Sequence, residues 1–255
     1  MELMKTPLLI AAVIVVLAIA GAVTYLAVSV NGSPESALLN AKELLMRNVT
    51  VTYRFTVSST FVVNNNEFPG IPGVPFQMGP LMGIVTISRT PISDATVING
   101  TLLFRHFMGT GINFNMALWR YDNELCYAME FNFMGQQAVT HCMPYVNLTK
   151  YVILALNESR YVGKGTWNGK TTYCFAATVT LTPAQGELQE MPVVMNITEL
   201  CILGNGVPTN VTIYLYPTYQ GGFGGMFMNI NMTLVNYSFT FNQQEFSQVT
   251  RGLVP

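Results

Sequence analysis

The sequence predicts a mainly β protein: an N-terminal transmembrane helix, one amphipathic helix, and then a large curved antiparallel sheet. Three observations lead to this prediction. An uncharged apolar run occupies residues 8–30, a short helical pattern follows it, and apolar and polar residues then alternate along most of the chain. We therefore divide the chain into a membrane anchor, residues 1–30, and an extracytoplasmic β-rich domain, residues 31–255.

The apolar run, LLIAAVIVVLAIAGAVTYLAVSV, is long enough to cross a bilayer, because a spanning helix needs about 20 apolar residues. Glu2 and Lys5 precede it, so its start is only weakly basic. Small residues at 20–22 and 27–29 would also suit cleavage of a secretory signal. A retained signal-anchor and a cleaved signal both fit, and the length of the run favours the anchor.

Asn-x-Ser/Thr sequons occur only after this run. Glycans are attached to such sequons at exposed sites of secreted proteins. We therefore expect a single-pass cell-membrane protein with a cytoplasmic N-terminus and an extracellular, N-glycosylated domain. The nine predicted acceptors are Asn31, Asn48, Asn99, Asn147, Asn157, Asn196, Asn210, Asn231 and Asn236.

Charged residues are scarce, at 10% of the chain against about 25% in ordinary soluble domains. The net charge is −1 and no basic run occurs, which excludes the electrostatic footprint of a nucleic-acid-binding protein. In this respect the composition resembles that of membrane-anchored surface proteins of thermophilic archaea.

The predicted helix begins after Ser33, a good N-cap, with Pro34 at its first position. Its apolar stripe includes Leu38, Ala41 and Leu45, and we expect it to end near Arg47. Strands follow, each with one apolar and one polar face, which is typical of an antiparallel sheet covered on one side. The clearest alternation covers residues 51–58, 112–118, 127–133, 173–179 and 211–215.

Two local irregularities are also predicted. Asn168-Gly169 between two such runs indicates a two-residue hairpin. Apolar residues change from even to odd positions between Leu234 and Tyr237, so we expect a β-bulge near Leu234-Val235.

Four cysteines follow the anchor and allow three pairings. Strands at 124–133 and 136–143 would place Cys126 opposite Cys142, and Cys174 and Cys201 flank the segment 182–197 in the same way. We therefore predict disulfides Cys126–Cys142 and Cys174–Cys201, the first as a cross-strand link on the polar face. An oxidising exterior favours both.

No motif for catalysis is present. The two histidines have neither HxH nor HExxH spacing, and there is no GxSxG, Ser-x-x-Lys or P-loop. We therefore expect no enzymatic activity, no cofactor and no metal site. The 15 methionines are more typical of adaptable apolar packing than of Cu(I) ligation.

A proline-rich segment, residues 67–80, interrupts the alternation. Proline at this density argues against a central strand, so we predict an apolar loop. It could simply cover the sheet, or it could form a lid over an apolar cavity. The predicted lid residues are Phe68, Ile71, Val74, Phe76 and Met78, with residues 223–228 as a second candidate.

The order of elements resembles the LolA/LppX-like lipoprotein-carrier superfamily. The resemblance rests on the helix at 33–47 leading into the strand at 51–63, the hairpin at 161–175, Gly206-Val-Pro208, and Tyr237-Ser-Phe239 with Phe246. It implies a sheet curled into a half-barrel whose apolar concave face holds acyl chains. This chain departs from the family pattern in having no lipobox cysteine near the anchor and no obvious basic residue placed to hold a lipid headgroup.

Two functions follow as hypotheses. The first is a membrane-tethered protein that holds a lipid or another apolar ligand without chemistry. The second is a structural or adhesive surface or filament glycoprotein that self-associates, and a subunit of a membrane complex is a third option. The predicted ligand-lining residues are Tyr53, Phe55, Val57, Phe114, Met116, Phe131, Phe133, Phe175, Ile213 and Leu215.

Overall fold

A computed structural model describes residues 32–62, 75–91, 94–104, 111–132, 136–145, 148–181, 193–217 and 226–250. The predicted anchor at 8–30 lies outside these ranges. Within them, no helix combines the length and the apolar character needed to cross a membrane.

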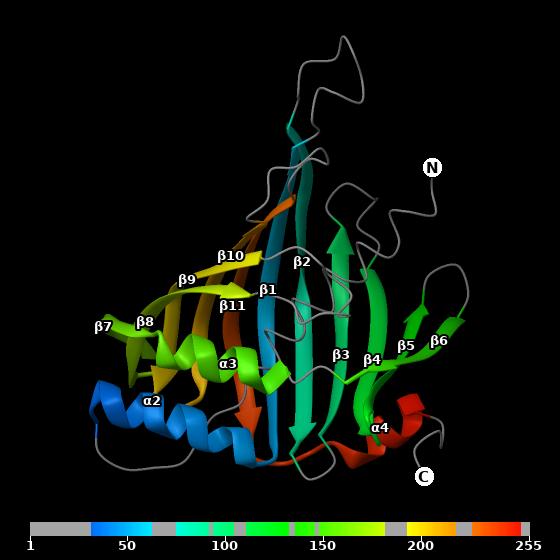
Figure 1. Cartoon of the computed structure of the whole chain (residues 1–255), viewed down its shortest axis with the longest axis horizontal. Helices are drawn as coiled ribbons and strands as arrows, with labels where there is room; N and C mark the ends of the chain where they lie inside the picture. Colours follow the sequence, from blue (N-terminus) through cyan, green and yellow to red (C-terminus); the bar gives the residue numbers. More distant parts are fainter. Residues whose placement is uncertain are drawn as a thin grey trace.

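One antiparallel sheet of eleven strands dominates the described chain, which confirms the predicted mainly β class (Figure 1). The spatial order is β6-β5-β4-β3-β2-β1-β11-β10-β9-β8-β7, so the sheet is open and β6 and β7 form its edges. The strands are β1 (Val49–Val62), β2 (Pro75–Thr90), β3 (Ala95–Phe104), β4 (Gly111–Tyr121), β5 (Glu124–Asn132), β6 (Gln136–Pro144), β7 (Arg160–Trp167), β8 (Lys170–Leu181), β9 (Val193–Leu203), β10 (Pro208–Pro217) and β11 (Met226–Ser238).

The predicted first helix is confirmed as α2 (Pro34–Glu43), which continues into the 3₁₀ turn η1 (Leu44–Met46). Ser33 caps it: its hydroxyl accepts from the Ser36 amide, and the Ser36 hydroxyl accepts from the Ser33 amide. The prediction of a single amphipathic helix, with at most a short helical turn near Thr149–Leu156, was wrong. That turn is the full helix α3 (Leu148–Asn157), and α4 (Gln243–Thr250) is also present. With only eight residues, α4 is too short to show a clear helical period.

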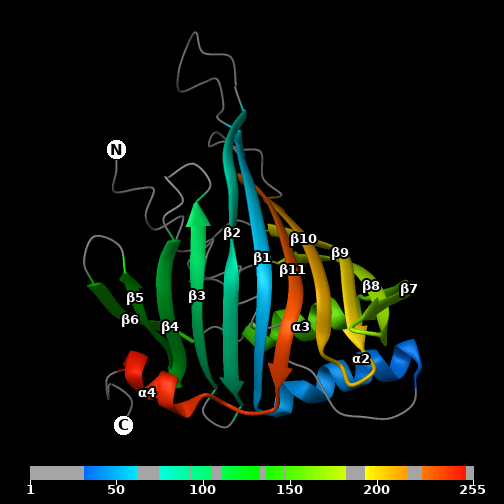
Figure 2. The same cartoon turned by 180° about the vertical axis from the view of Figure 1, so that it is seen from behind.

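The alternating residues place one apolar face, the inner face, on the same side of the whole sheet. Its side chains form a single buried cluster with residues from β1 to β5 and β8 to β11, joined by α2 and α3. Helix α2 packs mainly on β8 and β9, and α3 packs mainly on β8. Figures 1 and 2 show both helices on this side, with β3, β4 and β5 lying beyond the end of α3.

A second, smaller cluster lies on the opposite, outer face, where α4 packs against β3, β4 and β5. Phe246 of α4 meets Trp119 edge to face, with ring centroids 6.3 Å apart. Val97 and Ala117 complete the contact. Helix α4 therefore covers only this corner of the outer face, visible at the lower left of Figure 2.

Both predicted disulfides are confirmed. Cys126 lies directly opposite Cys142 on β5 and β6, and Cys174 lies opposite Cys201 on β8 and β9. Cys126 is on the outer face as expected, but it is buried in the cluster beneath α4 and not solvent-facing. The closed loops span 16 and 27 residues, so each bridge is expected to stabilise the fold by about 3 kcal/mol.

The predicted irregularities are confirmed as well. Thr52 pairs with Asn236 and Tyr53 pairs with Leu234, which leaves Val235 as the extra residue of a bulge in β11. Asn168 and Gly169 form the two-residue turn between β7 and β8, with φ of 47° and 75°. Positive φ at both positions is the condition for a type I′ hairpin.

The prediction that residues 67–80 form a loop throughout was wrong for its second half. Residues 75–80, including Phe76 and Met78, belong to β2, which lies in the middle of the sheet. Pro75 is the first residue of the strand. Pro80 lies at a register shift in the pairing of β2 with β1. The pairing of β2 with β3 starts one residue later, at Leu81. Both are positions where a missing amide hydrogen is tolerated.

Two inner-face glycines allow aromatic rings to approach the backbone closely. A Cβ on Gly83 would lie 3.0 Å from the ring of Phe55, its partner on β1. A Cβ on Gly100 would lie 2.8 Å from the ring of Phe114, its partner on β4, and 2.7 Å from the Ile84 carbonyl oxygen. These glycines are therefore required by packing and not by a turn.

We expect Gly100→Ala to destabilise the fold by about 1–3 kcal/mol, because the new methyl group overpacks the site against backbone as well as ring atoms. Urea unfolding measures the change. Gly163→Ala is the matched control, since no atom lies within 4 Å of the position that its new methyl group would take on β7. Equal stability of the two variants would contradict the proposed packing role.

We expect Phe246→Ala to release α4 from the sheet, because Phe246 is the main aromatic contact between them. In a Trp167→Phe background, Trp119 is the remaining tryptophan, and its fluorescence should shift to longer wavelength as it becomes hydrated. Gln244→Ala, at an exposed position of the same helix, is the control. An unchanged spectrum in Phe246→Ala would show that α4 does not shield Trp119.

Candidate functional site

The structure brings most of the predicted ligand-lining residues together on the inner face. Tyr53, Phe55, Phe114, Met116, Phe175, Ile213 and Leu215 are buried in the same cluster, and Val57 packs against it. Phe131 is placed by its backbone in β5, opposite Phe114, and Phe133 lies outside the described residues. Contact of these side chains with a ligand stays a prediction.

The inner face has two parts that differ in what covers them. Phe175, Ile213 and Leu215 come from β8 and β10, in the half on which α2 and α3 pack. Phe114 and Met116 come from β4, beyond the end of α3 (Figure 1). We call this second part, the inner face of β3 to β5, the far half. Its other buried members, none of them among the predicted ligand-lining residues, are Ile98, Leu102, Leu118, Leu125 and Met129.

Tyr53 sits at the centre of the inner face with no exposed surface. Its hydroxyl donates a 2.9 Å hydrogen bond to the carbonyl oxygen of Pro208, so it ties β1 to the start of β10. Burial raises the pKa of this hydroxyl far above its ordinary value. The hydroxyl is thus a structural group that already has its partner, and Tyr53 offers a ligand mainly its ring.

A polar cluster closes one end of the inner face. The Arg89 guanidinium, on β2, donates to the Asp94 carboxylate at 2.7 Å and to the Thr149 hydroxyl of α3 at 3.2 Å. Tyr145, which follows β6, donates its hydroxyl to the other Asp94 oxygen at 2.7 Å. The Arg120 guanidinium lies 4.5 Å from the centre of the Tyr145 ring.

This cluster fixes α3 and the end of β6 to the turn between β2 and β3. Asp94 occupies that turn with a φ of 43°, a conformation that aspartate tolerates better than most residues. Burial raises the pKa of Tyr145, and the hydrogen bond to Asp94 and its negative charge raise it further. Thr149 and Tyr145 are more than 50 residues from Arg89 and Asp94 in sequence, and the four share no motif, so only the fold could reveal the cluster.

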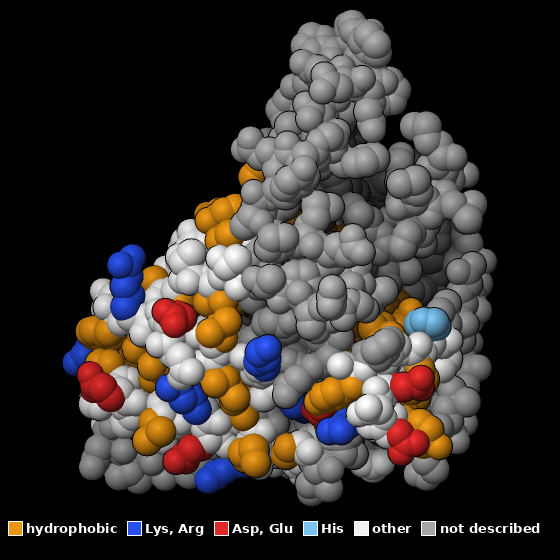
Figure 3. Space-filling view, in the orientation of Figure 1, with side chains coloured by type: hydrophobic (Ala, Val, Ile, Leu, Met, Phe, Trp, Pro, Cys, Tyr) orange, Lys and Arg blue, Asp and Glu red, His pale blue; other side chains and the backbone are white. Residues whose placement is uncertain are grey.

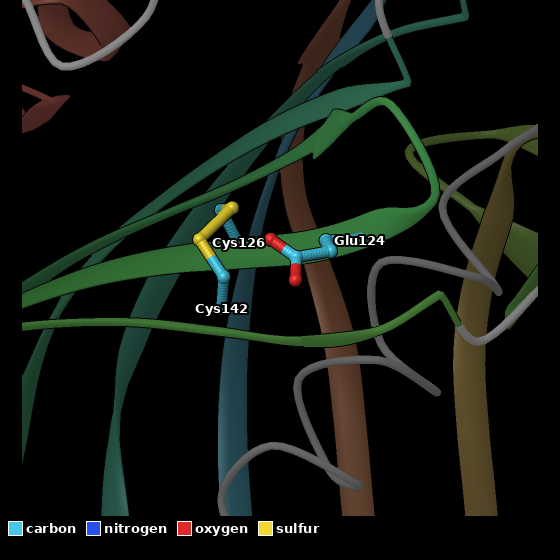
Figure 4. A group of neighbouring side chains, drawn as sticks. All are labelled: Glu124, Cys126 and Cys142. Carbon is cyan, nitrogen blue, oxygen red and sulfur yellow. A yellow bond between two sulfur atoms is a disulfide. The ribbon is translucent and has the colours of Figure 1, made fainter.

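Each disulfide has a glutamate beside it on the same strand. Figure 4 shows the Glu124 carboxylate directed toward Cys126–Cys142. Glu199 stands in the same relation to the other bridge, with one carboxylate oxygen 3.3 Å from the Cys201 sulfur. A metal ion would need thiolates, and the disulfide bonds use both sulfurs of each pair. These groups are therefore cross-strand links and not metal sites.

The predicted lid and acceptor sites are described only in part. Phe68, Ile71 and Val74 lie outside the described residues, as do Asn31 and Asn147. Of the second lid candidate, residues 223–225 also lie outside them, and residues 226–228 belong to β11, so the prediction of a loop was wrong for that part. The remaining predicted acceptors are placed: Asn48 just before β1, Asn99 on β3, Asn157 at the end of α3, Asn196 on β9, Asn210 on β10, and Asn231 and Asn236 on β11.

No protein-family model matches the sequence, and no curated protein matches it. Among solved structures, the chain is similar to a beta-barrel-like protein of domain of unknown function DUF1849 from Brucella abortus. The identity is 7% and the TM-score is 0.29, over 74% of this chain and 98% of that one. A score this low carries no argument about family or function. The resemblance to the LolA/LppX-like carriers is not confirmed and stays a prediction.

We expect Tyr53→Phe to cost about 1–3 kcal/mol at neutral pH, since it removes the hydroxyl donor to the buried Pro208 carbonyl. It should also change the pH dependence. The folded state holds the Tyr53 proton more tightly than the unfolded state, whose tyrosines titrate near pH 10. This contribution is full below about pH 10 and is lost as pH rises above it.

Urea unfolding of both proteins from pH 8 to 11 provides the measurement. The free energy of unfolding should fall more steeply above pH 10 in the wild type than in Tyr53→Phe. Tyr214→Phe, at an exposed position of β10, is the control and should follow the wild type. Parallel curves for wild type and Tyr53→Phe would contradict the assignment.

Proposed function

We propose that the protein is a membrane-tethered, extracytoplasmic binding protein that holds a lipid or another apolar ligand in a β half-barrel, without catalysis. One observation carries this proposal: the apolar inner face extends across the sheet, whereas α2 and α3 pack mainly on β8 and β9. The cytoplasmic N-terminus, the retained anchor and the extracellular position come from the sequence and are part of the proposal.

The dimensions support a ligand on the far half. Ten intervals of about 4.8 Å give the eleven strands a width of roughly 48 Å, whereas one helix covers about 10 Å. The far half is lined by aliphatic, aromatic and methionine side chains, and methionine adapts readily to irregular apolar shapes. Since these side chains are buried within the chain itself, binding requires the local packing over them to open.

Burial alone can supply the affinity. Each methylene group removed from water contributes about 0.8 kcal/mol, so an acyl chain with about ten buried methylenes gains roughly 8 kcal/mol before the costs of ordering and opening. Arg120 stands at the polar end of the inner face, where an exposed guanidinium can meet an anionic headgroup. The proposed orientation therefore has the acyl chain along β3 to β5 and its head near Arg120.

Photo-crosslinking tests the proposal without altering the protein. The full chain, purified in mild detergent, is incubated with a diazirine-bearing palmitate, irradiated and analysed by peptide mass spectrometry. Labels are expected on inner-face residues of β3 to β5, above all near Phe114 and Met116. Labels confined to residues 8–30, or no labels in the sheet, would contradict the proposal.

A matched pair of variants separates ligand retention from stability. Met116→Ala, in the far half, and Met195→Ala, on β9 in the helix-covered half, each remove a buried methionine and should cost a similar amount, about 2–5 kcal/mol. Only Met116→Ala should reduce the amount of lipid that native mass spectrometry finds bound. Equal retention by both variants would place the ligand elsewhere.

The structural or adhesive alternative has one observation in its favour. β6 is an edge strand that pairs with β5 over Glu124 to Asn132 without a register shift, so its free side can accept another strand. The other edge, β7, is interrupted by a register shift between Tyr161 and Gly163 and carries Lys164. Sedimentation of concentrated protein measures whether it self-associates, and a strictly monomeric particle would rule out this alternative.

A further inference from the structure

The outer face of the sheet gathers most of the described sequons, although acceptor sites are commonly on surface loops. In each of five sequons the asparagine and the threonine or serine point outward, and the residue between them points to the inner face. The five asparagines are Asn99, Asn196, Asn210, Asn231 and Asn236. The intervening residues are Gly100, Ile197, Val211, Met232 and Tyr237.

Two of these sequons face each other. Asn210 of β10 lies opposite Thr233, and Asn231 of β11 lies opposite Thr212. Asn231 is exposed, and its amide donates to Asn229 at 3.2 Å on the surface, a contact that water can replace. Asn236 is also exposed, next to the bulge at Val235.

The outer face also carries little charge where these sequons lie. On β9, β10, β11, β1, β2 and β3 the described strands contain three charged residues, Arg54, Arg89 and Glu199. Arg89 belongs to the inner face, where it bonds to α3, so Arg54 and Glu199 remain for the outer face. Lysines, arginines and acidic residues are instead scattered over the side that carries α2 and α3 (Figure 3).

This sparsely charged surface exposes several large apolar side chains. Met82 and Leu103 are directly paired on β2 and β3, Ile84 is close to them, and Phe227 and Val235 lie on β11. They are 40–48% exposed. An open sheet with such an outer face would associate readily with other apolar surfaces unless something bulky and hydrated covers it.

Asn99 differs from the other four. Its side-chain amide donates to the Glu245 carboxylate of α4, and α4 packs on β3. The nitrogen that would carry a sugar is therefore directed into a helix contact. A glycan at Asn99 and a docked α4 exclude each other.

We propose that the outer face is a glycan-bearing face, modified at Asn196, Asn210, Asn231 and Asn236, and that Asn99 on the same face is left unmodified because α4 covers it. The donor is an activated lipid-linked oligosaccharide phosphate. The bond between the sugar C1 and the phosphate oxygen breaks, a bond from C1 to the asparagine Nδ2 forms, and the amide proton leaves with the phosphate. The inference rests on the extracellular placement in the proposed function and not on the apolar ligand.

Glycopeptide mass spectrometry tests this directly. The full chain is produced in a host that performs N-glycosylation, purified from membranes, and deglycosylated enzymatically in ¹⁸O water to mark each occupied asparagine. We expect occupancy at the four outer-face sites and none at Asn99. Asn157, exposed at the end of α3, serves as the acceptor away from this face.

Two variants at Thr233 and one at Phe246 test individual acceptor sites. Thr233→Val removes the Asn231 sequon while keeping a β-branched residue, and Thr233→Ser keeps the sequon. The first should lose one glycan and the second none. Phe246→Ala, which releases α4, should make Asn99 available for modification.

The outcomes are distinguishable. Occupied Asn157 with vacant outer-face sites, or an occupied Asn99 in the wild type, would overturn the inference and leave the extracellular placement intact. A chain without glycan at any sequon would overturn the inference and also the extracellular placement. Neither result bears on whether the crosslinking experiment finds an apolar ligand in the sheet.

Discussion

Nine of the eleven strands, β1 to β5 and β8 to β11, bury apolar side chains on one face, and the described chain offers no second sheet to cover that face. That constraint governs the rest of the structure. Two short helices pack mainly on β8 and β9, and the aromatic rings of Phe55 and Phe114 pack closely against Gly83 and Gly100. The inner face is consequently one continuous apolar cluster and not a set of separate cores. A ligand on its far half would extend the same solution by adding apolar surface from outside the chain.

The edges and ends of the sheet are held by a different class of interaction. The two disulfides each join an edge strand or its neighbour to the next strand, Cys126 to Cys142 and Cys174 to Cys201. The polar cluster around Arg89 and Asp94 fastens α3 across one end. These links hold the parts of an open sheet that have the fewest neighbours, and a chain with 10% charged residues has few ion pairs with which to do so otherwise.

The two faces imply a division of roles. The inner face is apolar and internally packed, which suits an apolar cargo. The outer face is rich in threonine and asparagine, and its five strand sequons all have an inward-pointing middle residue. The alternation that builds the apolar face therefore also produces the Asn-x-Thr pattern on the other side. Helix α4 divides the outer face into a covered corner, with its own small core around Trp119 and Phe246, and an open area.

The features that could be predicted from the residues are local: the capped helix after Ser33, the alternation of the strands, the turn at Asn168-Gly169, the bulge at Val235 and, through strand register, both disulfides. All but the disulfides follow from neighbours a few residues apart, and the disulfides join cysteines on neighbouring antiparallel strands, 16 and 27 residues apart. The remaining features required the folded chain. The fold places Pro75 and Pro80 within a central strand, because those positions need no amide hydrogen. It also docks α4 over Cys126 and brings Arg89, Asp94 and Tyr145 together. Such contacts depend on which strands become neighbours, and the alternation of apolar and polar residues does not determine the strand order.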